Sequence, residues 1–71
     1  MTWSTAKIDV QINEYKKVRP EPGNDELALL ESALFLEGAF GILLSDEDIT
    51  ASQIGTYDSM RRFIIQRLDP P

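Results

Sequence analysis

The feature that most constrains the fold is a block of mainly apolar, helix-forming residues bounded by chain breakers. Residues 19–24, Arg-Pro-Glu-Pro-Gly-Asn, hold two prolines, which fix φ and lack a backbone donor. At the other end, Gly41 is typical of a helix C-terminus. The apolar residues between them are Leu27, Ala28, Leu29, Leu30, Ala33, Leu34, Phe35, Leu36, Ala39 and Phe40. We therefore predict a central helix over residues 24–41, with Asn24 as its cap.

This helix is too apolar to bury only one face. At about 100° per residue its side chains form two apolar stripes, Leu29, Ala33, Leu36 and Phe40 in one sector and Leu27, Leu30 and Leu34 in another. Glu31, Ser32 and Gly38 mark the side expected to face water, with Phe35 among them. A tightly wrapped bundle could bury both stripes. Alternatively, the second stripe, edged by Glu31, is a docking face.

Length and composition restrict the chain to one small domain, residues 1–71. A domain of this size buries roughly 60% of its unfolded surface, so its core is thin and a partner could add burial. The sequence has no cysteine, and disulfides and thiolate metal sites are therefore excluded.

The charge balance favours a basic partner surface. Lys and Arg total 7 against 12 Asp and Glu, a formal net charge of −5, which argues against nucleic acid as a ligand. No apolar run approaches the roughly 20 residues needed to span a bilayer, and the N-terminus lacks a signal-peptide pattern. We expect a soluble cytoplasmic protein that does not insert into membranes.

Two further helices are predicted after Gly41. Ser45 and Asp48 have capping-box spacing, which favours a short helix over residues 46–53. The acids at 46–48 do not form a calcium loop, because the glycine and glutamate of that pattern are missing. Thr56 can cap a last helix over residues 56–68, and Pro70-Pro71 would end it. Its apolar residues form a single stripe, Met60, Phe63, Ile64 and Leu68.

The pattern of residues 1–18 fits two conformations. Ile8, Ile12 and Tyr15 form a helical stripe, whereas Ile8, Val10 and Ile12 alternate with polar residues as in a strand. We favour a helix from about Ser4 to Lys17, joined to the central helix in a tight hairpin, because the other helices offer no sheet edge. If the segment were extended, exchange of an arm within a homodimer would become plausible.

Two segments resemble an acyl carrier protein. They are Gly23-Asn24-Asp25-Glu26-Leu27 and Glu37-Gly38-Ala39-Phe40-Gly41-Ile42, and the ending Ser52 to Ile64 is similar in a looser way. In that family a Gly-x-Asp-Ser-Leu turn opens the second helix, and a Leu-Glu-x-x-Phe-Gly-Ile-like end follows fourteen residues after the serine. Counting back from Phe40 places Glu26 at the position of the serine that carries 4′-phosphopantetheine. A carboxylate cannot accept that group.

The resemblance implies an all-α, three- to four-helix bundle of acyl-carrier type with a shortened N-terminal region. It further implies that the central helix presents apolar and acidic side chains to a basic partner such as a synthase, ligase or transferase. The partner-binding candidates are Leu27, Leu30, Glu31, Leu34 and Phe35. With Glu26 at the attachment position, we expect no phosphopantetheine and no other cofactor.

Catalysis is not indicated by the residue set. The chain has no histidine, the usual base at neutral pH, and no cysteine nucleophile. No catalytic residue and no metal ligand is assigned, and Ser32 is interpreted as a solvated or back-bonded helical serine. We expect a carrier-like domain that binds another protein in a lipid, polyketide or other natural-product pathway. The alternatives are an active or unusually modified acyl carrier protein and a small helical adaptor or regulatory subunit unrelated to acyl transfer.

Overall fold

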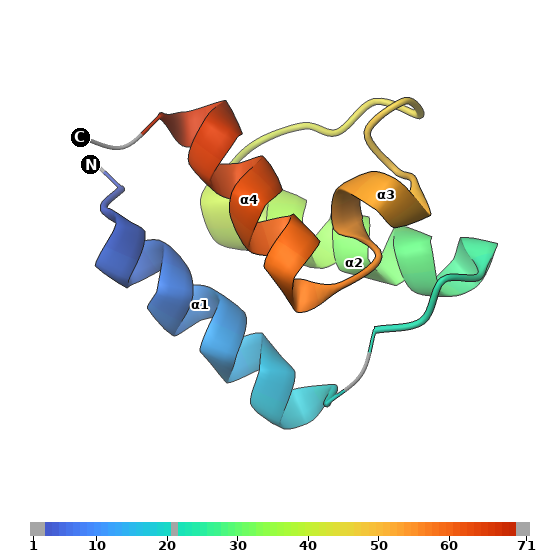
Figure 1. The fold of residues 1–71 in the computed structure, drawn as a ribbon, viewed down its shortest axis with the longest axis horizontal. Helices are drawn as coiled ribbons and strands as arrows, with labels where there is room; N and C mark the ends of the chain where they lie inside the picture. Colours follow the sequence, from blue (N-terminus) through green and yellow to red (C-terminus); the bar gives the residue numbers. More distant parts are fainter. Residues whose placement is uncertain (1–2, 21, 70–71) are drawn as a thin grey trace.

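The protein forms a small all-α bundle, as predicted from the sequence. A computed structural model describes residues 3–20 and 22–69, and its helices are α1 (Thr5–Val18), α2 (Glu26–Phe40), α3 (Ala51–Ile54) and α4 (Tyr57–Leu68) (Figure 1). Within these residues there is no β-strand. Three predicted breaker residues, Glu21 and the two terminal prolines, lie outside the described part of the chain.

The N-terminal segment is helical, which decides between the two conformations that its pattern allowed. Ser4 caps α1 by accepting a hydrogen bond from the Lys7 amide at 3.2 Å, so the helix begins within one residue of the predicted start. Ile8 and Ile12 are buried in the core, as the helical stripe requires. The extended arm, and with it the reason to expect arm exchange, is not observed.

The helices do not pack in the order of a simple hairpin. α1 packs against α4, α4 against α3, and α3 against the N-terminal half of α2 (Figure 1). The Nε atom of Arg61 on α4 donates to Asp9 on α1 at 2.6 Å, and this interaction raises the pKa of Arg61. The first two helices therefore do not form a tight hairpin: α1 packs mainly on α4 and meets α2 through the stack of Tyr15 on Phe35.

Residues at the ends of α2 explain where this helix begins and ends. Asp25, and not Asn24 as predicted, is the N-cap, and its carboxylate accepts a hydrogen bond from the Ala28 amide at 2.8 Å. Glu26 is consequently the first helical residue. Gly41 ends the helix with a φ of 67°, a left-handed conformation that glycine adopts without strain.

The buried face of α2 differs in part from the predicted one. Ala33, Leu36 and Phe40 are buried in the core, as expected for the first stripe. Ser32, expected to face water, is fully buried, and its hydroxyl has no hydrogen-bond partner among the described residues. The interpretation of Ser32 as a serine that faces water or bonds to a carbonyl of the preceding helical turn is therefore wrong.

The side of α2 that was predicted to face water is covered by an aromatic contact. Phe35 stacks on Tyr15 of α1 with ring centroids 3.9 Å apart. Tyr15 in turn meets the ring of Tyr57 of α4 edge-on at 6.2 Å. α1 and α4 therefore exclude water from a sector of α2 that the sequence pattern alone assigned to solvent.

The loop between α2 and α3 replaces most of the predicted third helix. Residues 46–48 form a turn, and α3 begins only after Thr50, which caps it. The Asp48 carboxylate accepts from the Ser45 amide at 3.0 Å and from Arg67 of α4 at 2.8 Å. The Ser45 amide, chiefly, together with Arg67, holds the pKa of Asp48 below its ordinary value. The Ser45–Asp48 spacing therefore stabilises a turn tied to α4 and does not start a helix.

The last helix follows the prediction closely. Thr56 caps α4 in a reciprocal capping box with Ser59, and Met60, Phe63 and Ile64 are buried. Asp58 lies in the first turn and Arg67 in the last, where the helix dipole stabilises a negative and a positive charge respectively.

Replacing Ser32 with alanine should stabilise the protein. The change removes a buried hydroxyl without a partner and raises helix propensity, so we expect the free energy of unfolding to increase by about 1 kcal/mol in urea denaturation. Ser59→Ala is the matched control, since the Ser59 hydroxyl accepts from the Thr56 amide at 3.0 Å and its loss should destabilise by about 1 kcal/mol. A destabilised Ser32→Ala protein would mean that the hydroxyl is hydrogen-bonded in solution.

Candidate protein-binding face

Three leucines of α2 remain at the surface of the folded domain. Leu27, Leu30 and Leu34 keep 67%, 44% and 67% of their surface exposed. They lie within about 60° of one another around the helix axis, because successive residues turn by about 100°. We call these three residues the leucine face. The bundle therefore buries one apolar stripe of α2 and leaves the other in water.

The two remaining candidates from the sequence lie beside this face. Glu31 forms an ion pair with Arg19, in the segment that follows α1, and is half-buried. Phe35 is also half-buried and packs against the core through its stack on Tyr15. Three of the five candidates thus share one exposed surface, Glu31 lies at its edge, and Phe35 faces the interior.

The surroundings of the leucine face are acidic. Residues 20–60, which include α2, the following loop and α3, contain no lysine or arginine. The same segment contains nine of the 12 acids of the chain, namely Glu21, Asp25, Glu26, Glu31, Glu37, Asp46, Glu47, Asp48 and Asp58. The seven basic residues all lie before or after it. The segment therefore carries nine negative charges at neutral pH, of which Glu31 and Asp48 are paired with Arg19 and Arg67.

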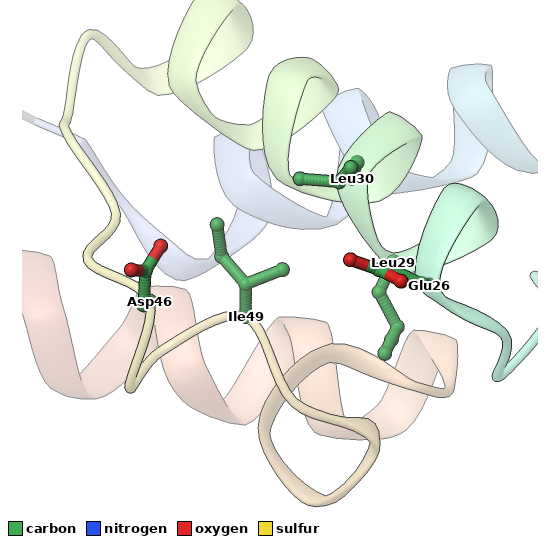
Figure 2. Close-up of a pocket in the computed structure, with 5 residues that line it drawn as sticks. All are labelled: Glu26, Leu29, Leu30, Asp46 and Ile49. Atoms are coloured by element: carbon green, nitrogen blue, oxygen red, sulfur yellow. The ribbon is translucent and has the colours of Figure 1, made fainter.

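A pocket adjoins the leucine face at the N-terminal end of α2. It has a volume of about 320 Å³ and is lined by Glu26, Leu29, Leu30, Asp46 and Ile49 (Figure 2). Leu30 belongs to both surfaces. In Figure 2, Asp46 and Ile49 lie on the loop before α3, across the pocket from the α2 residues. We call this hollow the acidic pocket, because a carboxylate from each side borders a floor of apolar side chains.

The two carboxylates of the acidic pocket have no partner among the described residues. Other acids do have one: Asp9, Glu14, Glu31 and Asp48 form ion pairs, and Asp25 and Glu37 accept backbone amides. No hydrogen bond or ion pair joins the carboxylate of Glu26 or of Asp46 to a side chain or amide in the described part of the protein. Within residues 3–20 and 22–69, no basic side chain pairs with either carboxylate of the pocket.

Of the residues that line the acidic pocket, the sequence analysis had singled out Glu26 as the residue at the attachment position and Leu30 as a partner-binding candidate. It did not identify Leu29, Asp46 or Ile49 as parts of a site. Asp46 lies twenty positions after Glu26, and only the path of the loop brings it to α2. The one usable signal was the absence of basic residues between positions 20 and 60.

The described residues form few other features that could bind a ligand or a metal ion. A second hollow, of about 470 Å³, is lined by Trp3, Lys7, Val10, Gln11 and Ala39 and brings only one charged group to an apolar surface. Over residues 3–20 and 22–69, no three potential metal ligands cluster. None of the helices in that range has the length and apolarity required to cross a bilayer.

Comparisons with known protein families, with characterised proteins and with solved structures found no significant match to this chain. The functional argument therefore rests on the leucine face, the acidic pocket and the charge distribution around them.

Proposed function

We propose that this protein is a non-catalytic binding domain of acyl-carrier-like build, which docks a basic protein surface through the leucine face. The observation that carries the proposal is the exposure of Leu27, Leu30 and Leu34 on one side of a helix within a segment that has no basic residue. Contiguous apolar surface framed by charges is typical of protein interaction sites.

Charge complementarity selects the kind of partner. A second copy of this chain would bring two acidic helices together, each from a protein with a net charge of −5, and the carboxylates would repel. A surface rich in lysine and arginine would instead be attracted and oriented by the same groups. The proposed partner is therefore a different protein with a basic docking patch, such as a synthase, ligase or transferase of a lipid or natural-product pathway.

Glu26 supports a binding role over a carrier role. It is exposed on the first turn of α2, directly after the cap Asp25, where the resembled family has its attachment serine. A carboxylate there cannot accept phosphopantetheine, so the domain would keep the recognition helix without the prosthetic arm.

Leu34→Ala should weaken binding by more than about 1 kcal/mol, as expected for a residue at the centre of an interface. The partner is first captured from the native cell with the wild-type domain, and the dissociation constant of each variant is then measured with the purified partner. Leu43→Ala is the matched control, because Leu43 is 82% exposed but lies beyond α2 and should leave the affinity unchanged. Normal binding by a folded Leu34→Ala protein would contradict the docking face. Added salt should mainly slow association.

A further inference from the structure

We propose that the acidic pocket binds one lysine or arginine side chain of the protein partner. The inference rests on the proposed function and deepens it, because it names the group that the partner inserts beside the leucine face. It follows from the lining of the pocket, from the unpaired carboxylates and from the position of Leu30.

The lining suits a long side chain that ends in a cation. Leu29, Leu30 and Ile49 offer apolar contact to an aliphatic stem, while Glu26 and Asp46 can accept hydrogen bonds from the charged head (Figure 2). Lysine and arginine combine these two parts, since their methylene stems pack on apolar surface and their heads remain hydrated at its rim. Charge-assisted hydrogen bonds to carboxylates are stronger than neutral ones.

The chain itself supplies no cation to this pocket. Arg19, Arg61 and Arg67 are engaged with Glu31, Asp9 and Asp48 respectively. The acidic pocket lies within the segment from which basic residues are absent, and its two carboxylates have no partner in the part of the chain that the structure describes. A cation from outside could therefore pair with Glu26 or Asp46 without displacing an internal partner.

An organic cation fits this lining better than a metal ion. Calcium requires six to eight oxygen ligands, whereas the pocket offers two carboxylates and three apolar side chains. Because Leu30 borders both the leucine face and the pocket, a partner that covers the face would have its side chains within reach of Glu26 and Asp46.

The test uses the whole domain and defined probes, and it does not need the partner. Lysine and arginine, each capped as the Nα-acetyl methylamide, are titrated into ¹⁵N,¹³C-labelled protein and followed by NMR. Capped norleucine, which has a four-carbon side chain without the ammonium group, is the neutral control for lysine, and n-butylammonium represents a free amine. We expect the capped cations to shift the methyl signals of Leu29, Leu30 and Ile49, with saturation on the order of 1–10 mM, and norleucine to leave them in place.

Matched variants then separate the pocket from the general negative charge. Glu26→Gln combined with Asp46→Asn should weaken binding of the capped cations by about fivefold or more, since both carboxylates that can pair with the cation become neutral. Glu47→Gln combined with Asp58→Asn removes the same charge from two exposed acids outside the pocket and should have little effect. The amide spectrum of each variant reports whether it is folded.

Four results would overturn the proposal: no shift with any probe, equal binding of norleucine, an equal loss in both double variants, or binding of n-butylammonium without binding of the capped residues. The last result would assign the pocket to a free amine. None of them would affect the Leu34→Ala test, because that test measures the leucine face with the purified partner. A failure of the pocket and a failure of the proposed function are thus distinguishable.

Discussion

Glu26→Ser should turn this domain from an inert protein into a substrate of a promiscuous phosphopantetheinyl transferase. The change rebuilds Asp-Ser-Leu between Asp25 and Leu27, the turn around which the family resemblance is centred. Position 26 is exposed and is the first residue of α2, so the new hydroxyl would be accessible at the head of the helix. Since serine is tolerated near a helix start, the cost to folding should be within about 1 kcal/mol.

Intact mass after incubation with coenzyme A and the transferase is the measurement. We expect modification of Glu26→Ser, slower than that of an ordinary carrier because the loop between α1 and α2 is shorter than in the resembled family, and no modification of the wild-type protein. Glu47→Ser is the control, since it also places serine at an exposed glutamate but outside a helix start. A mass increase in the wild type would refute the loss of the attachment site. A folded Glu26→Ser protein that stays unmodified would limit the resemblance to helix packing and favour the adaptor hypothesis.

The sequence predicted those elements whose boundaries are set by local chemistry. Thr56 and Gly41 act through the backbone of their own helix ends, by capping and by a left-handed conformation, and the structure has both in the predicted role. Such signals depend on residues three or four positions away, so a linear pattern contains them.

The boundaries of the third helix could not be predicted in this way. The Ser45–Asp48 spacing is compatible with a capped helix and with a closed turn. In both cases the Asp48 carboxylate accepts a hydrogen bond from the Ser45 amide. The contact of Asp48 with Arg67, nineteen residues later, ties this loop to α4. α3 is therefore confined to the residues after Thr50.

The environment of each side of α2 also depended on tertiary structure. A helical projection gives the angle at which Ser32 and Phe35 leave the axis, but it does not say which other helix packs there. Tyr15 of α1 covers Phe35 and Ser32 is buried, whereas Gly38 of the same sector is exposed as predicted. For the same reason the exposed state of Leu27 and Leu34 was left open by the pattern and became visible only in the assembled bundle.

Leu36→Ala and Leu34→Ala should differ widely in their effect on folding, although both shorten a leucine of the same helix. Leu36 is fully buried among the core residues, whereas Leu34 is 67% exposed. Truncating a buried leucine costs about 2–5 kcal/mol, because apolar contact is lost and a cavity remains. Truncating an exposed one changes stability by about 0.5 kcal/mol or less.

The consequence for a domain of this size is large. At about 0.05–0.15 kcal/mol per residue, 71 residues give a total stability of roughly 4–11 kcal/mol, of which Leu36→Ala would remove between about a fifth and all. Urea denaturation of both variants measures the difference. If Leu34→Ala proved as costly as Leu36→Ala, the leucine face would be part of the folding core, and its exposure could no longer support a docking role. A small cost for Leu34 combined with weaker partner binding would instead mean that this leucine contributes to recognition and little to folding.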